Sequence, residues 1–226
     1  MHPLQTPFHT HKIPFSSGSS DLWAWSYATR AFMHETTAGC GATLIPERAV
    51  KRIVVQVAQA LKEMHGCGYF HGDVKIENVL VGYRDDCVDD GCGGVEVRLA
   101  DFGHVRHWMR GMDAYGTREV SPPEFLSGFV GESPVDGRKA DVFALGVLMF
   151  MLLSDEGQLP SAVRVFRAGG LGYESLLALH HGFYPLDDIG LEPVPMSLLY
   201  AMTRVDPDTR YSIDDVLAHP YLADVV

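Results

Sequence analysis

Apolar positions along the chain predict one amphipathic helix and one helix that is apolar on every face. From Glu47 to His65, apolar residues recur three and four positions apart, which is typical of a helix with one face in a core. They are Val50, Ile53, Val54, Val57, Leu61 and Met64. Pro46 suits the first turn of this helix. The 12 apolar residues of Val142–Leu153 are too few to span a membrane, which takes about 20, so they predict a buried helix capped by Asp141.

Shorter patterns predict a third helix and a β-hairpin. Asp21 opens a helix that runs from Leu22 to about Glu35. Apolar segments at Asn78–Val81 and Val95–Leu99 predict two paired strands around an insertion rich in Asp and Gly. A calcium loop is not predicted in that insertion, because Val97 stands where a loop of that kind needs glutamate. Residues 1–20 lack periodicity and predict a flexible segment.

Composition narrows the classes of function. The 226 residues suit one large domain or two small ones, and the net charge of −11 argues against nucleic-acid or anionic-membrane binding. A basic peptide is a compatible partner. The start of the chain is not a signal peptide, so we expect a cytoplasmic or nuclear location. The cysteines form no CxxC pair, and this predicts free thiols. A local disulfide between Cys87 and Cys92 is the alternative.

Two polar segments carry groups that suit phosphoryl transfer. The first is His71–Asn78, and the second is Leu99–Gly103, whose Asp101 follows Asp73 by 28 residues. Asp73 can orient an incoming hydroxyl, and Lys75 can contact the transferred phosphate. Asn78 and Asp101 offer the hard oxygens that Mg²⁺ prefers, and leave room for phosphate oxygens and water.

These segments, with three that follow, resemble motifs of the eukaryotic protein kinases. His71–Asn78 and Asp101–Gly103 are similar to the catalytic loop and the D-F-G loop. Residues 116–124 are similar to G-T-x-x-[YW]-x-A-P-E, with Pro122 in the alanine place. Residues 141–147 are similar to D-x-[WF]-[SA]-x-G-[VC], and residues 206–212 and 219–221 to the last helices of the family. A chance match in this order is improbable, so the chain resembles a serine/threonine protein kinase.

The resemblance implies a fold and a domain organisation. The fold would be mainly α (α+β), the large C-terminal lobe of a kinase with short β-hairpins at the active site. Residues 21–226 would form this kinase domain, with an activation segment at 101–124, and residues 1–20 would be a flexible remnant of the hinge.

The resemblance also implies an activity and its residues. The chain would transfer the γ-phosphate of ATP to a serine or threonine hydroxyl of a protein, with Mg²⁺. Asp73, Lys75 and Thr117 would be catalytic, and Thr117 would hydrogen-bond near the other two. Asn78 and Asp101 would hold the metal and, with Lys75, the nucleotide, and Leu80 would lie under the adenine.

Other implied roles are structural. Glu124 and Arg210 would form a buried ion pair, and breaking it would leave a charge without a partner. Asp141 would hold the backbone of the catalytic loop from below. His71 and Phe102 would belong to an apolar spine.

Two departures from the family pattern bear on regulation and on the substrate. Gly72 replaces an arginine that in the family receives an activation-loop phosphate, so we expect no switch of that kind. Tyr115 carries the only hydroxyl between Phe102 and Gly116, which fits that expectation. Glu77, with Glu119, favours a basic side chain near the acceptor, and a solvated surface glutamate is the alternative.

The small lobe that covers ATP in the family has no counterpart in this sequence. No G-x-G-x-x-G precedes His71, and Lys12 is the only lysine before Lys51. We therefore expect an N-lobe that is absent or vestigial. ATP should then bind with a dissociation constant of about 1 mM or higher. The chain would be a truncated form, would take the missing cover from a partner that binds the exposed face, or would have lost catalysis. A kinase-like scaffold that binds proteins is the alternative function, and the intact Asp73, Asn78 and Asp101 favour the enzyme.

Overall fold

The computed structural model describes residues 20–36, 45–83, 94–108, 116–117, 120–126, 136–154 and 190–226. The predicted flexible segment up to residue 19, the acidic insertion at 84–93 and Cys40, Cys87 and Cys92 lie outside these residues. Cys67 is described, and it is a free, exposed thiol, as predicted. No helix in the described part is long and apolar enough to cross a membrane.

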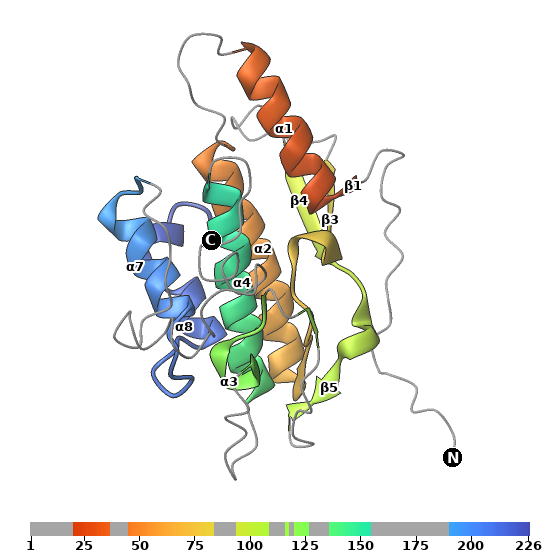
Figure 1. The fold of residues 1–226 in the computed structure, drawn as a ribbon, viewed down its shortest axis with the longest axis vertical. Coiled ribbons are helices and arrows are strands. Elements are labelled where there is room, and N and C mark those ends of the chain that lie inside the picture. Colours follow the sequence, from red (N-terminus) through yellow and green to blue (C-terminus); the bar gives the residue numbers. More distant parts are fainter. Residues whose placement is uncertain are drawn as a thin grey trace.

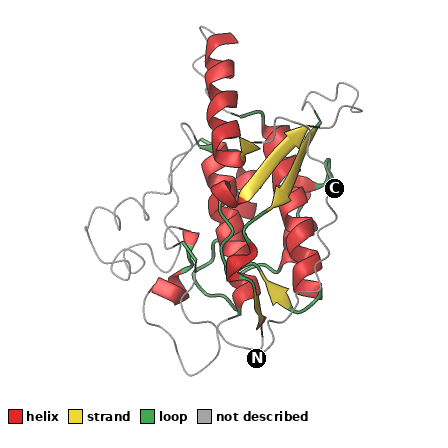
Figure 2. Ribbon diagram, turned by 90° about the vertical axis from the view of Figure 1, so that its right-hand side faces the viewer, coloured by secondary structure: helices red, strands yellow, loops and turns green. Residues whose placement is uncertain are grey.

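Helices make up most of the described structure, and short strands lie beside them (Figures 1 and 2). The helices are α1 Leu22–Thr36, α2 Glu47–Gly66, α3 Pro123–Leu126, α4 Gly137–Leu153, α7 Pro193–Met202 and α8 Ile213–Leu217, with 3₁₀ turns η1 Ile76–Asn78, η2 Phe102–His104 and η6 Pro220–Leu222. The strands are β1 Ser20–Asp21, β2 Tyr69–Phe70, β3 Val79–Tyr83, β4 Val95–Leu99 and β5 Arg106–His107.

Helices α2 and α4 form the centre of the core. In Figure 1 they run side by side, with α7 and α8 on one flank and the β3–β4 hairpin on the other. Every member of the predicted α2 stripe is buried, which confirms the amphipathic reading. Pro46 lies just before α2, as its N-terminal flanking residue, and not inside the first turn. The core therefore forms around the two helices that the sequence marked most strongly.

Two small antiparallel sheets flank the loops that carry the candidate site. Strand β3 pairs with β4 in a hairpin, as predicted, with Val79 opposite Leu99, and β1 adds to the other edge of β3. Strand β2 pairs with β5, placing Tyr69 opposite His107. Because His71 directly follows β2 and Asn78 directly precedes β3, the two sheets anchor both ends of the loop between them.

Helix α4 begins earlier than the sequence predicted, and Asp141 is not its cap. Asp136 fills that position, and its carboxylate accepts a hydrogen bond from the backbone N–H of Arg138 at 3.0 Å. Asp141 lies one turn inside the helix and is buried. The apolar pattern failed to mark the true start because the first turn, Gly137–Lys139, carries no large apolar residue.

Helix α1 is held at its start and, through Arg30, near its middle. Asp21 caps it, with Oδ1 accepting the backbone N–H of Ala24 at 2.7 Å. Arg30 is buried and its Nη2 donates to the carbonyl oxygens of Met151, Leu152 and Ser154, at 2.9, 3.2 and 3.3 Å. These carbonyls end α4, where a helix leaves acceptors without partners and carries partial negative charge. One arginine therefore joins α1 to the C-terminus of α4.

Candidate active site

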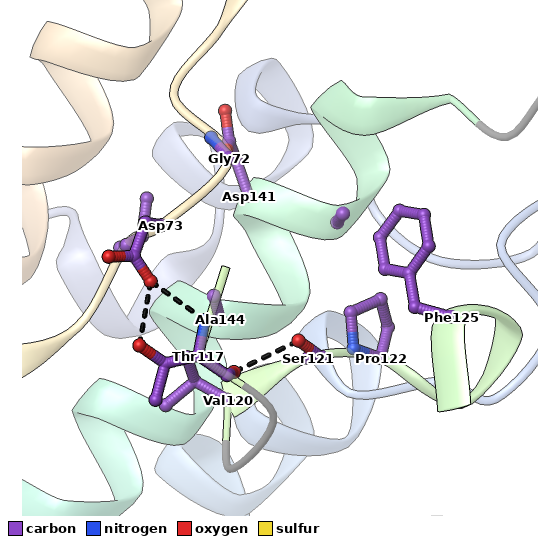
Figure 3. Close-up of a pocket in the computed structure, with 11 residues that line it drawn as sticks. Gly72, Asp73, Thr117, Val120, Ser121, Pro122, Phe125, Asp141 and Ala144 are labelled. Atoms are coloured by element: carbon purple, nitrogen blue, oxygen red, sulfur yellow. Dashed lines mark hydrogen bonds between the residues drawn. The ribbon is translucent and has the colours of Figure 1, made fainter. Parts of the chain in front are cut away.

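The carboxylate of Asp73 is the centre of the candidate site. Oδ2 accepts hydrogen bonds from Lys75 Nζ at 2.8 Å and from Asn78 Nδ2 at 2.9 Å. Oδ1 accepts the backbone N–H of Thr117 at 2.9 Å and its Oγ1 hydroxyl at 2.8 Å, both drawn in Figure 3. Lys75 Nζ also donates to Thr117 Oγ1 at 2.8 Å. All three predicted catalytic residues and one predicted metal ligand therefore meet at the buried carboxylate of Asp73.

These donors keep Asp73 ionised. Burial by itself would raise the pKa of its carboxyl group, but the hydrogen bonds from Lys75 and Thr117 and the lysine charge outweigh burial and hold the pKa below its ordinary value. Asp136 is shifted in the same direction, since bonds from Arg138 outweigh burial there. Both groups are carboxylates at neutral pH.

This shift predicts a loss of stability in acid. Because the folded-state pKa values of Asp73 and Asp136 lie below the unfolded value of 3.8, their stabilisation is complete above that pH and is lost as the pH falls through the folded values. We expect the free energy of unfolding, measured with urea, to fall between about pH 4 and pH 2. Asp136→Asn should make that fall shallower. A free energy that is constant over this range would contradict the assignment.

Asp141 fixes the backbone that presents Asp73. Its Oδ2 accepts the backbone N–H of His71 at 2.8 Å, and its Oδ1 accepts that of Gly72 at 2.9 Å, which confirms the contact implied for Asp141. His65, at the end of α2, places Nε2 2.9 Å from the same Oδ2. Sequence reasoning missed His65, because nothing local in the sequence marks a contact 76 residues away. The loop therefore rests on both central helices.

The backbone at residue 72 favours glycine. Gly72 has φ +79°, a left-handed conformation that L side chains rarely adopt. A Cβ added there would lie 2.8 Å from the carbonyl oxygen of His104. A side chain at this position would therefore need the 3₁₀ turn after Asp101 to shift. This geometry gives a physical reason for the departure from the arginine of the family pattern.

Asn78 and Asp101 lie on neighbouring backbone segments. The backbone N–H of Ala100 donates to the carbonyl oxygen of Asn78 at 2.8 Å, so Asp101 directly follows a residue bonded to Asn78. Asp101 has φ 58°, is exposed, and accepts the N–H of Gly103 with Oδ1 at 3.2 Å. The amide of Asn78 uses its nitrogen toward Asp73, which leaves its oxygen for another partner.

These oxygens fit a magnesium ion that is shared with phosphate. Within the described residues, His, Cys, Asp and Glu nowhere gather in a group of three that could hold a metal. Mg²⁺ in nucleotide sites commonly takes one or two protein oxygens and completes its octahedron with phosphates and waters. One amide oxygen and one exposed carboxylate match that donor set.

The remaining predicted residues lie around this centre. His71 and Phe102 are in contact, with ring centroids 5.5 Å apart, as expected for the spine. Leu80 is half-buried on β3, opposite Asp21 and Arg98, and no described contact links it to Asp73. The ion pair expected between Glu124 and Arg210 is present, with two bonds of 2.7 and 2.9 Å.

A pocket adjoins the Asp73 carboxylate. It has an empty volume of about 270 Å³, part of which is open to solvent, and lies between the Asp73 loop, α3 and α4 (Figure 3). Its walls include Val120, Pro122 and Phe125. Ser121 donates its hydroxyl to the carbonyl of Thr117 at 2.9 Å and so joins the pocket wall to a residue bound to Asp73.

Comparison with known proteins finds similarity to protein kinases. The family model described as "Protein kinase domain" matches residues 27–222. A membrane-associated tyrosine- and threonine-specific cdc2-inhibitory kinase of Drosophila melanogaster is 31% identical over 79% of this chain and 29% of its own length. CBL-interacting protein kinase 20 of Oryza sativa is 31% identical over 80% of this chain and 36% of its own length.

A human protein extends the comparison. Testis-specific serine/threonine-protein kinase 3 of Homo sapiens is 27% identical over 79% of this chain and 60% of its own length. The chain therefore spans between 29% and 60% of the lengths of these relatives.

Proposed function

The chain belongs to the protein kinase domain family, and we propose that it transfers the γ-phosphoryl group of ATP to a serine or threonine hydroxyl of a protein. The observation that carries this proposal is the ionised Asp73 carboxylate, bound at once by Lys75, Asn78 and Thr117. A solvated surface aspartate would not collect four donors in a buried position. An acceptor-orienting carboxylate requires such an arrangement.

In this proposal Asp73 orients the acceptor and does not need to be a strong base. Phosphoryl transfer passes through a loose transition state, so positioning and charge supply most of the catalysis. A carboxylate with a lowered pKa accepts a hydrogen bond from the acceptor hydroxyl and takes its proton as the new O–P bond forms. The bond between the γ-phosphorus and the oxygen that bridges to the β-phosphate breaks in the same step, and ADP leaves. The hydroxyl of Thr117 donates to Oδ1, which supports the proposal that this carboxylate accepts hydrogen bonds from alcohols.

Lys75 links the acceptor and the nucleotide. Its ammonium group lies 2.8 Å from both Asp73 Oδ2 and Thr117 Oγ1, and its side chain is partly exposed. We propose that it contacts the transferred phosphate, where a fixed cation stabilises the equatorial oxygens.

Asn78 and Asp101 would hold magnesium, and Leu80 would lie under the adenine. The metal would neutralise charge on the β- and γ-phosphates when ATP is bound. Residues 21–226 would form the large lobe, and the cover over the phosphates would come from polypeptide outside the described residues.

Two observations support serine and threonine as acceptors. A lysine stands two residues after Asp73, as in the serine/threonine-specific pattern. Two of the relatives above carry threonine or serine/threonine in their names, although one of these names also includes tyrosine.

A second function, a scaffold that binds proteins without transferring phosphate, is favoured by one observation. The turn that follows Asp101 is exposed to solvent at Phe102 and Gly103, and Phe102 is 48% exposed. An exposed aromatic face of this kind suits a protein partner.

Phosphoamino-acid analysis separates the two functions. The chain is incubated with γ-³²P-ATP, Mg²⁺ and a mixture of unphosphorylated proteins, alone and after extension by any upstream coding sequence. Label on serine and threonine that disappears in Asp73→Asn supports the kinase. Label on tyrosine alone contradicts the proposed specificity, and absence of label in every form favours the scaffold.

A further inference from the structure

Trp108 joins the end of β5 to the start of α4 through contacts that the proposed chemistry does not use. Its backbone N–H donates to the carbonyl oxygen of Gly68 at 3.1 Å. Its ring is stacked on that of His107, with centroids 6.0 Å apart and planes inclined by 18°. The guanidinium of Arg138 lies over the Trp108 ring, 4.9 Å from its centroid. Trp108 therefore links two elements that are far apart in the sequence and lie at the same end of the molecule (Figure 1).

A carboxylate holds Arg138 in this position. Asp136 accepts hydrogen bonds from Arg138 Nε at 2.9 Å and from Nη2 at 2.8 Å, which is the two-bonded arrangement that suits a planar guanidinium. These bonds raise the pKa of Arg138 above its ordinary value. Asp136 also caps α4, so the guanidinium is attached to the first turn of that helix. A cation fixed over an aromatic face is attracted to the ring, and Trp108 is therefore held against α4.

The chain between Asp101 and β5 is bonded to itself. The backbone N–H of Val105 donates to the carbonyl oxygen of Phe102 at 3.3 Å. Arg106 Nη1 donates to the carbonyl oxygens of Gly103 and Val105, at 3.3 and 2.8 Å. The N–H of Gly103 donates in turn to Asp101 Oδ1 at 3.2 Å. Because these bonds follow one another along the segment, a displacement of β5 would move the Asp101 carboxylate as well.

The start of α4 also holds the loop that presents Asp73. Asp141, in the same helix, bonds the backbone just before Asp73. A Cβ added at Gly137 would lie 2.5 Å from the ring of Phe70, so β2 packs directly on the first turn of α4. One end of one helix therefore carries the Asp73 loop through Asp141, and carries the Asp101 segment through the arginine–tryptophan contact.

We propose that Trp108 and Arg138 are positioning residues of the candidate active site: their contact keeps β5 on the start of α4, and so fixes where the Asp101 carboxylate lies relative to Asp73. This inference rests on the proposed kinase function for the use of that geometry. Neither side chain is among the partners of the Asp73 carboxylate. Because Asp101 is proposed to hold Mg²⁺, loosening the contact should raise the Mg²⁺ concentration that phosphoryl transfer requires.

Hydrogen exchange of the 226-residue chain tests the contact without ATP or metal. Exchange at the backbone amides of residues 103 and 108 is measured by mass spectrometry with fragmentation that resolves single amides. Trp108 and the Arg138 side chain are each 39% exposed, so their contact has the strength of a surface cation–π pair. Arg138→Gln should therefore raise exchange at these two amides by about two- to fivefold. Trp108→Ala should raise it at least as much, because it also removes the stack on His107.

Conservative and matched variants show whether the contact itself is responsible. Arg138→Lys keeps a cation and Trp108→Phe keeps a ring, so both should exchange more slowly at the two amides than Arg138→Gln and Trp108→Ala. The matched control is Lys51→Gln. Lys51 lies over the ring of Tyr221, 4.7 Å from its centroid, and donates to Asp224 at 3.1 Å, which is the same kind of arrangement on α2. This control should leave exchange at the two amides unchanged.

Transfer kinetics test the consequence for the active site. In a form of the protein that is active, Arg138→Gln should raise the Mg²⁺ concentration for half-maximal rate by about two- to fivefold, and Arg138→Lys should stay near wild type. A loss of folded protein would lower the rate at every Mg²⁺ concentration and leave the half-maximal concentration unchanged. The comparison therefore separates positioning from stability.

The outcomes separate this inference from the proposed function. Unchanged exchange in both Arg138→Gln and Trp108→Ala, or an equal rise in Lys51→Gln, overturns the inference. Faster exchange with an unchanged half-maximal Mg²⁺ concentration also overturns it, because the contact would then be structural only. Faster exchange in a protein that transfers no phosphate in any form supports the link between α4 and the Asp101 segment, and contradicts only the kinase proposal.

Discussion

Replacing Asp73 with asparagine should lower kcat for phosphoryl transfer by about 10²- to 10⁴-fold. The substitution removes the negative charge that accepts the substrate hydroxyl. It also places an amide N–H₂ among donors, because Lys75, Asn78 and Thr117 all donate to this side chain. Steady-state transfer to a serine peptide, in a form of the protein that is active, measures the change.

The control is another aspartate with no contact to the site. Asp208 is exposed, and Asp208→Asn should leave kcat unchanged. Unfolding in urea shows whether the Asp73 variant stays folded. A folded Asp73→Asn protein with wild-type kcat would remove Asp73 from the mechanism.

Replacing Glu124 with alanine should reduce the free energy of unfolding by roughly 3–5 kcal/mol. The Arg210 side chain is fully buried and Glu124 is 10% exposed. Arg210 Nε also donates to the carbonyl of Arg204 at 2.8 Å, and Nη1 to that of Lys139 at 3.0 Å. Without Glu124 these neutral carbonyls remain as the partners of a buried cation, and they do not balance its charge. Urea denaturation followed by circular dichroism measures the loss.

A surface ion pair provides the comparison. Lys62 and Asp214 are 2.7 Å apart, but their side chains are 55% and 68% exposed. Lys62→Ala should cost less than about 1 kcal/mol, since water and salt screen such pairs. If both variants lose the same amount, burial does not determine the strength of the Glu124–Arg210 pair.

Local patterns predicted the parts of the fold that depend on local physics. The stripe on α2 and the β3–β4 hairpin follow from side-chain periodicity, and the structure confirms both. Contacts between residues of one short loop, such as Asp73 with Lys75, could also be predicted from the sequence. Their spacing already places them on the same loop.

Contacts across long sequence distances could not be predicted in this way. The position of Asp141 was misread, because an aspartate before an apolar run looks like a cap whether or not the helix starts earlier. Its bonds to the catalytic-loop backbone were expected only through the family resemblance. Neither the His65 contact nor the bonds of Arg30 to α4 left a local signal. The metal and nucleotide roles of Asn78, Asp101 and Leu80 remain predictions.

The bonds of Arg30 to the end of α4 fix the distance between α1 and the acceptor site. Helix α4 also holds the Asp73 loop through Asp141, so α1 and the acceptor site are attached to one rigid element. If part of a protein substrate binds α1, that part lies at a constant separation from a hydroxyl held at Asp73. Chains bridge such a span only when the intervening linker is long enough, and longer linkers lower the effective concentration. The length of chain between the segment that binds α1 and the acceptor residue would then help to select which serine or threonine is modified.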